Sequence, residues 1–278
     1  MAIERRLAAA SDQRLDALRS LGAGIYEETR PPDDLRHVVA CLWVRVVRHR
    51  GATRRTPIIP DGCSDLIVFD ELPPVVAGPD AITRWIDVAD GAVITGLRLR
   101  PGGVRAVFGC PATAILNREV RLSDLVCDAG ALHQRLLRAG TVRQRYRVLA
   151  HWTRDTLDRT AAPDRAVRLA CEALAHDLRA DVGTLARRFD WHTRAIRRHF
   201  HAACGYGPKH FQRIMRVQRA IRLAHAPVPL RLADLALAAG YADQPHMTRD
   251  FRDVTGFTPA QYLPDTRPEF GVWLAEGW

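Results

Sequence analysis

Residues 198–211 read RHFHAACGYGPKHF, and residues 249–262 read RDFRDVTGFTPAQY. The two segments share the pattern R-x-F-x4-G-aromatic-x-P-x2-aromatic at an offset of 51 residues. Upstream, an LAxxxxW pattern from residue 185 matches an LAxxxxY pattern from residue 235 at an offset of 50. Self-similarity at such a period is typical of a duplicated structural unit. The carboxy-terminal part of the chain is therefore predicted to hold two copies of one helical unit.

Each copy predicts two short helices joined by a tight turn. The second helix of the first copy has Ile196 and Phe200 at the spacing of one helix face, and Met247 and Phe251 are spaced in the same way in the second copy. Gly240 permits the tight turn before the second of these helices. Two short helices around a tight turn form a helix-turn-helix motif. The duplication therefore predicts two such motifs.

A basic helix is predicted between the two copies. It begins at Pro208, a favourable first helical residue, and ends before Pro227. Its inner face is predicted to bury Phe211, Ile214 and Ile221. Phosphate contacts are predicted from its basic residues, which are Lys209, Arg213, Arg216, Arg219 and Arg222. If this helix holds the two motifs roughly 34 Å apart, both reach successive major grooves of B-DNA.

The positive charge of the chain is concentrated on the first copy and on this helix. The chain has 41 Lys and Arg against 31 Asp and Glu, a net charge of +10. Residues 187–222 hold ten basic residues and one acidic residue, a net of +9 (10 − 1), which leaves +1 elsewhere. Residues 231–253 hold three basic and four acidic residues. We expect the first copy to supply most of the electrostatic affinity for DNA and the second mainly discrimination.

Residues 164–264 resemble the DNA-binding domain of the AraC/XylS family of bacterial transcription regulators. The resemblance rests on ADLALAAGYADQPHMTRDF (233–251), GFTPAQY (256–262), IRRHF (196–200), GYGP (205–208) and RVQRA (216–220). It implies base contacts from Arg194, Arg197 and Arg198 in the first copy, and from Gln244, Pro245, Thr248 and Arg249 in the second. Arginine and glutamine are suited to guanine and adenine edges, respectively.

Two residues depart from the pattern of this family. His192 stands where the family usually has a capping serine, so the start of the helix that follows is expected to be less well fixed. Pro245 replaces a residue that could have donated a hydrogen bond to a base, which weakens the expected sequence reading at that position.

The amino-terminal region is rich in short β-like runs. They cover residues 38–47, 57–60, 66–69, 75–78 and 93–99, and turn signals separate them. Such a pattern predicts a barrel or a sandwich. The segments PDGCSDL (60–66) and GLRLRPGG (96–103) resemble a regulatory domain found with this type of DNA-binding domain. That resemblance implies a cupin-like β-barrel that senses a ligand or mediates dimerisation.

These patterns predict an α+β chain in five parts. The parts are a helical extension (1–24), a β-rich regulatory domain (25–124), a helical segment and linker (125–163), the all-α DNA-binding domain (164–266) and an apolar tail (267–278). Asp164 is placed to cap the first helix of the DNA-binding domain. The tail is expected to dock on the protein or on a partner.

Composition and missing motifs exclude several classes of protein. The apolar fraction of 47% suits a folded core, and no apolar run approaches the roughly 18 residues of a membrane span. The six cysteines form no CxxC pair, and the first 20 residues contain no signal peptide, so we expect a cytoplasmic protein with reduced thiols. No nucleophile elbow, phosphate loop or cupin-type metal motif occurs, so we predict no enzyme, no cofactor and no metal site.

Cys63 supports two alternative interpretations. It is either a core cysteine beside a turn, which we favour, or a sensor thiol. In the second case it could also act as the alkyl acceptor of a DNA-directed thiol protein. Asp61 and Asp65 are more typical of carboxylates that hydrogen-bond a turn than of a catalytic pair.

The sequence therefore predicts a sequence-specific DNA-binding transcription regulator, controlled by a signal in its amino-terminal domain. The expected partners are double-stranded promoter or operator DNA, RNA polymerase, a small-molecule effector and a second copy of the chain. A non-specific nucleoid-type DNA binder is the other alternative.

Overall fold

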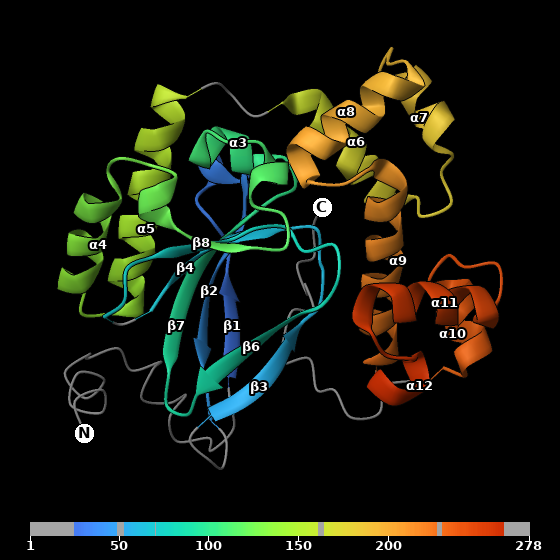
Figure 1. Cartoon of the computed structure of the whole chain (residues 1–278), viewed down its shortest axis with the longest axis horizontal. Coiled ribbons are helices and arrows are strands. Elements are labelled where there is room, and N and C mark those ends of the chain that lie inside the picture. The colour runs from blue at the N-terminus through green and yellow to red at the C-terminus, as the bar shows by residue number, and fades with distance from the viewer. Residues whose placement is uncertain (1–24, 49–52, 70, 161–163, 227–229, 264–278) are drawn as a thin grey trace.

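The computed structural model describes residues 25–48, 53–69, 71–160, 164–226 and 230–263 (Figure 1). An antiparallel, sheet-rich amino-terminal part is followed by an all-helical carboxy-terminal part, which confirms the predicted α+β class. The predicted helical extension (1–24) and apolar tail (267–278) lie outside the described residues.

The amino-terminal part contains two sheets rather than one closed barrel. The main sheet has the order β1 (Ile25–Thr29), β2 (Val39–Val46), β7 (Val93–Leu99), β4 (Ser64–Val68), β5 (Val75–Ala77) and β8 (Glu119–Arg121). A separate ribbon pairs β3 (Thr53–Ile58) with β6 (Arg84–Ala89). Within the described residues the edge strands β1 and β8 do not pair with each other, so the predicted cupin-like barrel stays open.

Strand β2, which lies next to the edge strand β1, is buried on both faces. Leu42, Val44 and Val46 pack on one side, whereas Cys41 and Trp43 pack on the other, as alternation along a strand requires. A register shift between Val39 and Cys41 marks a bulge at the start of this strand. The main sheet is therefore covered on both faces.

Helices cover one face of the main sheet. They are α3 (Gly103–Phe108), α4 (Ala129–Arg138) and α5 (Val142–Arg159), and the last two lie in the stretch predicted to be helical after residue 125. Leu132 and Leu149 from these helices join Leu97 and Leu99 of β7 in one buried cluster. The β3–β6 ribbon faces the opposite side of the sheet, where Trp43, Val88 and Ile94 form a second cluster.

The carboxy-terminal part consists of seven helices within the described residues. They are α6 (Arg165–His176), α7 (Val182–Arg188), α8 (Thr193–Cys204), α9 (Pro208–Ala224), α10 (Leu232–Ala238), α11 (Gln244–Thr255) and α12 (Pro259–Tyr262). Asp164 caps α6 as predicted, since its side chain accepts hydrogen bonds from the backbone N–H groups of Ala166 and Val167.

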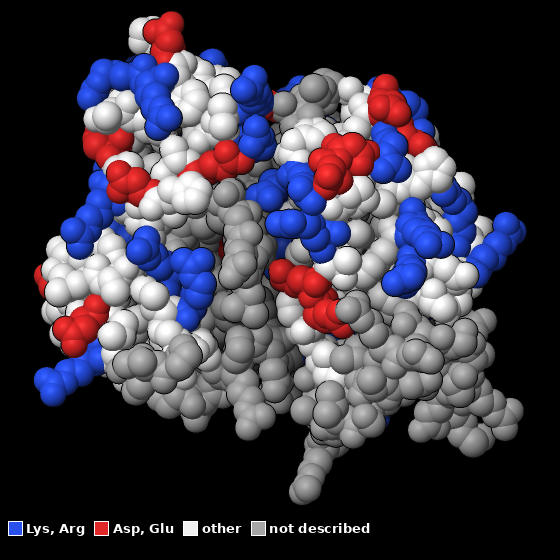
Figure 2. Space-filling model, turned by 180° about the vertical axis from the view of Figure 1, so that it is seen from behind, with Lys and Arg blue, Asp and Glu red and all other residues white. Residues whose placement is uncertain are grey.

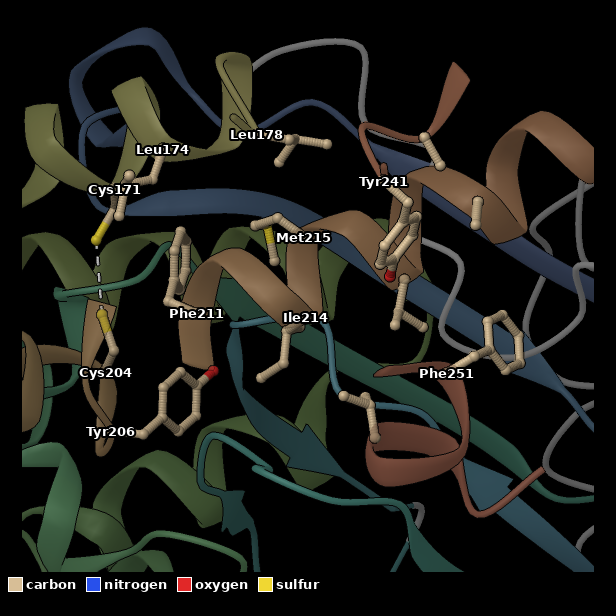
Figure 3. Close-up of a cluster of buried hydrophobic side chains, with 14 of the residues drawn as sticks. Cys171, Leu174, Leu178, Cys204, Tyr206, Phe211, Ile214, Met215, Tyr241 and Phe251 are labelled. Atoms are coloured by element: carbon tan, nitrogen blue, oxygen red, sulfur yellow. Dashed lines mark hydrogen bonds between the residues drawn. The ribbon is translucent and has the colours of Figure 1, made fainter. Parts of the chain in front are cut away.

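Helix α9 supplies the core of both halves of this part. Its Phe211, Ile214 and Ile221 are fully buried, as predicted. Figure 3 shows α9 side chains between the Cys171–Cys204 pair on one side and Tyr241 and Phe251 on the other. The helix therefore joins the two motifs through one continuous core.

Candidate nucleic-acid interface

The internal repeat of the sequence is also a repeat of backbone geometry. The Trp191 N–H donates to the Ala186 carbonyl at 2.8 Å, and the Tyr241 N–H donates to the Ala236 carbonyl at 2.9 Å. The turns before these aromatic residues contain Asp190 with φ of 54° and Gly240 with φ of 92°. Both turns therefore use the left-handed conformation at the same position of the motif, which only glycine adopts without strain.

The second helices of the two motifs end in the same way. Gly205 ends α8 with φ of 82°, and Gly256 ends α11 with φ of 79°. Their N–H groups donate to the carbonyls of His201 and Arg252. A left-handed residue after the last helical turn favours glycine, which explains why the sequence repeat contains one there.

The starts of these helices differ. Asp243 caps α11, because its side chain accepts a hydrogen bond of 2.7 Å from the His246 N–H. His192 makes no side-chain cap hydrogen bond to any described residue, which agrees with the expected loss of a serine cap. Trp191 instead stacks on His199, with ring centroids 4.6 Å apart.

The residues predicted to contact bases lie on the outer faces of α8 and α11. Arg194, Arg197 and Arg198 are all exposed on α8. On α11, Gln244, Pro245 and Arg249 are exposed and Thr248 is half-buried. The Thr248 hydroxyl donates to the Gln244 carbonyl at 2.9 Å. Their contacts with bases stay predictions.

The residues predicted to contact phosphates fall into two groups. Lys209 and Arg222 are exposed, whereas Arg213, Arg216 and Arg219 are half-buried. Figure 2 shows the face behind Figure 1, where basic side chains are spread over both halves with acidic ones between them. The positive charge of this face is therefore interspersed with acidic residues.

Two arginines of α9 form ion pairs inside the protein. Arg213 lies 3.1 Å from Asp250 and 3.4 Å from Asp253, both on α11. Arg216 lies 3.6 Å from Asp250 and over the ring of Tyr241. These pairs were not predicted from the sequence, although two acidic residues on a predicted DNA-reading helix, Asp250 and Asp253, were a signal for them. The predicted phosphate contacts of both arginines would compete with this internal pairing.

A cavity of about 700 Å³ lies between the main sheet and the β3–β6 ribbon. Its wall contains aromatic and aliphatic side chains from both sheets, among them Tyr26, Trp43, Ile67, Phe69, Ile86 and Ile94. Charged side chains also reach it, including Asp61, Asp65, Asp80, Arg84 and Arg98.

A buried cluster of charges forms one end of the cavity. The Nε and Nη2 atoms of Arg98 donate to the two carboxylate oxygens of Asp65 at 3.1 and 3.4 Å. Arg98 Nη1 lies 3.4 Å from Asp61 and 3.7 Å from Glu28, and the Trp43 indole donates to Asp65 at 2.7 Å. Asp61 and Asp65 belong to the PDGCSDL segment (60–66), and Arg98 belongs to the GLRLRPGG segment (96–103), so these two segments meet here. Arg98 is the charged residue of the apolar run VITGLRL (93–99), and this position in the sequence was a signal for a buried charge.

Cys63 is a buried residue of this region. Its backbone N–H donates to Asp61 at 2.9 Å, which agrees with the interpretation of Asp61 as a residue that hydrogen-bonds a turn. Burial, with the nearby Asp61 carboxylate, raises the pKa of the Cys63 thiol well above its ordinary value. A buried, protonated thiol is a poor nucleophile, so the structure favours a core cysteine over a reactive one.

Comparisons with known proteins agree with this geometry. Residues 185–264 match the family model of a helix-turn-helix domain, and residues 27–121 match that of a domain of unknown function, DUF6597. The comparison with curated proteins finds no match. None of the helices in the described part of the chain is long and apolar enough to span a membrane.

Solved structures of two proteins are similar to parts of the chain. One is a probable AraC family transcriptional regulator from Rhodopseudomonas palustris CGA009, with 28% identity over 38% of this chain and 100% of that one, and a TM-score of 0.34. The other is ToxT from Vibrio cholerae, with 10% identity over 86% of this chain and 97% of that one, and a TM-score of 0.41. A ToxT structure with bound (E)-4-(8-methylnaphthalen-1-yl)but-3-enoic acid has 9% identity, the same coverage and the same TM-score.

The fold and the matched family model together define a helix-turn-helix protein. Its carboxy-terminal domain is of the AraC type, and it follows an amino-terminal domain from a family of unknown function. These findings support a DNA-binding transcription regulator.

Proposed function

We propose that the protein binds specific DNA sequences through α8 and α11, and that a small molecule in the amino-terminal cavity controls this binding. The observation that carries the proposal is the pair of equivalent motifs at the two ends of α9 (Figure 1). A helix of 17 residues is about 25 Å long, so the recognition helices must extend beyond its ends to span the roughly 34 Å of one turn of B-DNA.

The outer faces of the two helices suit complementary tasks. Arg194, Arg197 and Arg198 give α8 three exposed cations, which favour both phosphates and guanine edges. Gln244 and Arg249 give α11 one exposed amide and one exposed guanidinium among acidic neighbours. We therefore assign most of the salt-dependent affinity to α8 and most of the added discrimination to α11.

The walls of the cavity support its role as a control site, because two of its loops also touch the DNA-binding domain. In the 59–63 loop, the Pro60 carbonyl accepts a hydrogen bond of 2.6 Å from Gln218 on α9, and Gly62 packs against Phe211. In the 80–84 loop, the Thr83 N–H donates at 3.0 Å to the Val254 carbonyl at the end of α11. A ligand that shifts these loops would act directly on the domain that holds both recognition helices.

The proposal extends to the expected partners. The regulator would act in the cytoplasm on promoter DNA, recruit or exclude RNA polymerase, and pair with a second copy on two adjacent sites. Pairing would place further recognition helices on the DNA and raise the affinity for tandem sites.

The decisive experiment is selection of DNA from a random pool with the full chain, followed by footprinting on the selected sequence. We expect a discrete protected site, and about a tenfold or greater loss of affinity for it in Arg198→Ala and in Arg249→Ala. Arg138→Ala, which removes an exposed arginine of α4, is the matched control and should bind normally. Even protection without a discrete site would indicate a non-specific binder. Unchanged affinity in both recognition variants would refute the assignment of the sites.

A further inference from the structure

We propose that the cavity binds an organic cation, that is, a small apolar molecule that carries one basic group such as a protonated amine. This inference rests on the proposed function only in naming the cavity as the control site. The chemistry of the ligand follows from the wall of the cavity alone.

Most of the wall suits an apolar body. Tyr26 and Trp43 lie with ring centroids 6.0 Å apart, and Ile67, Phe69 and Ile94 extend the same surface. Trp43 is held in place, because its ring lies over Gly96, where a Cβ atom would come within 2.3 Å of the indole. Aromatic faces of this kind also attract cations. The wall therefore accepts an apolar molecule without excluding a positive charge.

The charged side chains of the wall are predominantly acidic. Among the described residues, six carboxylates line the cavity against three arginines, a formal net charge of −3 (3 − 6). The carboxylates are Asp61, Asp65, Glu71, Asp80, Asp87 and Glu119, and the arginines are Arg45, Arg84 and Arg98. A ligand with a positive charge complements this excess, whereas a carboxylic acid is repelled by it.

The two central arginines already face more than one carboxylate each. Arg98 lies against Asp65 and Asp61, and Arg84 lies 3.3 Å from Asp80 and 3.4 Å from Glu119. An anionic ligand would meet the carboxylates that already lie against each guanidinium and would be repelled by them. A cationic group can instead approach Asp61 or Asp80 from the cavity without breaking an existing pair.

Arg98 provides an independent indication that the cavity takes a ligand. It is 7% exposed, and its Nη1 makes no hydrogen bond with the described residues, although it lies near Asp61 and Glu28. A buried donor without a hydrogen bond is unfavourable. A hydroxyl or carbonyl oxygen beside the basic group of the ligand would accept from this atom.

The acidic wall fits an organic cation better than a metal ion. No group of three or more His, Cys, Asp or Glu side chains in the described part of the chain is arranged to hold a metal. Arginines separate the carboxylates, and their guanidinium groups would repel a divalent ion. An amine needs only one or two carboxylates and tolerates an aromatic neighbour.

Burial makes ionisation of Asp61 and Asp80 less favourable while the cavity lacks a cation. Burial raises the pKa of Asp61, and it raises the pKa of Asp80 to about 6. A bound cation would favour the ionised form of both, because opposite charges attract strongly where water is excluded. The affinity for a cation should consequently fall as the pH falls below about 6.

The test compares three probes that share one apolar body, namely phenylbutylamine, phenylbutanol and phenylbutanoate, by titration calorimetry with the full chain. We expect the amine to bind at least about tenfold more tightly than the alcohol and the acid. Asp61→Asn should remove most of the advantage of the amine over the alcohol. Asp158→Asn, at an exposed position of α5, is the matched control and should behave as the wild type does.

The outcomes separate the ligand class from the proposed function. Tighter binding of the acid, or no binding of any of the three probes at millimolar concentration, would overturn the inference. If Asp61→Asn unfolds, the comparison of the three probes on the wild type still decides the question. DNA binding is measured separately, so an amine that binds to a protein without a specific DNA site would refute the proposed function and leave the ligand class standing.

Discussion

The side-chain amide of Gln218 donates a hydrogen bond of 2.6 Å to the carbonyl oxygen of Pro60. Gln218 belongs to α9, the helix between the two motifs, and Pro60 lines the cavity of the amino-terminal part. Ile59, next to Pro60, is buried in the core cluster of the carboxy-terminal helices. One short loop therefore belongs both to the candidate ligand site and to the core that positions the recognition helices.

Replacing Gln218 with alanine should weaken the effect of a ligand on DNA binding without abolishing either activity. One hydrogen bond contributes about 1 kcal/mol, so the change in operator affinity on ligand binding should shrink by about fivefold. Fluorescence anisotropy with and without ligand measures this coupling. Gln134→Ala, at an exposed position of α4, is the control. If the ligand changes operator affinity equally in the wild type and in Gln218→Ala, the Gln218–Pro60 hydrogen bond does not couple the two sites.

The ion pairs between α9 and α11 should stabilise the second motif. Asp250 is 6% exposed and faces both Arg213 and Arg216, so Asp250→Asn should lower the free energy of unfolding by about 2 kcal/mol. Asp253 pairs with Arg213 from an exposed position, so Asp253→Asn should change the free energy of unfolding by less than about 0.5 kcal/mol. Urea unfolding of the two variants measures the difference. Equal effects would show that burial does not decide the strength of these pairs.

The duplicated helical domain could be predicted from the sequence because its signals are local. The repeat, Gly240, and the apolar spacing of Met247 and Phe251 each specify a turn or a helix face by themselves, and the structure confirms them. The amino-terminal part was predicted less completely. Strand β6 was missed because its exposed positions include the apolar residues Trp85 and Ala89, so its hydropathy does not alternate although its burial does. The Arg98–Asp65 pair joins residues 33 positions apart, and no local pattern specifies that contact.

The uncapped start of α8 offers a direct test of the helix-capping argument. His192→Ser should place a hydroxyl where it can accept a hydrogen bond from the first turn, and it should stabilise the protein by about 1 kcal/mol. Asp243→Ala removes the equivalent cap from α11 and should destabilise the protein by a similar amount. Thermal unfolding of both variants measures these changes. A stability loss in His192→Ser would show that the Trp191–His199 stack already fixes this turn better than a cap does.

Asp80 should make the stability of the protein depend on pH in an unusual direction. Burial raises its pKa to about 6, whereas an aspartate in an unfolded chain has a pKa of about 3.9. The folded state therefore binds the proton more tightly, so this contribution to stability is present below about pH 4 and is lost as the pH rises through about 6. The positive charge of Arg84 lowers the pKa of Asp80 and so opposes the effect of burial, whereas the negative charges of Asp61 and Asp65 raise this pKa further.

Asp80→Asn isolates this contribution, because asparagine does not titrate. The free energy of unfolding of the wild type relative to this variant should fall by about 2 kcal/mol between pH 4 and pH 7. Urea unfolding at each pH measures it, with Asp124→Asn at an exposed position as the control. A parallel pH dependence of wild type and Asp80→Asn would show that folding does not raise the pKa of Asp80. In that case Asp80 would contribute its full negative charge to the cavity wall at neutral pH even without a ligand.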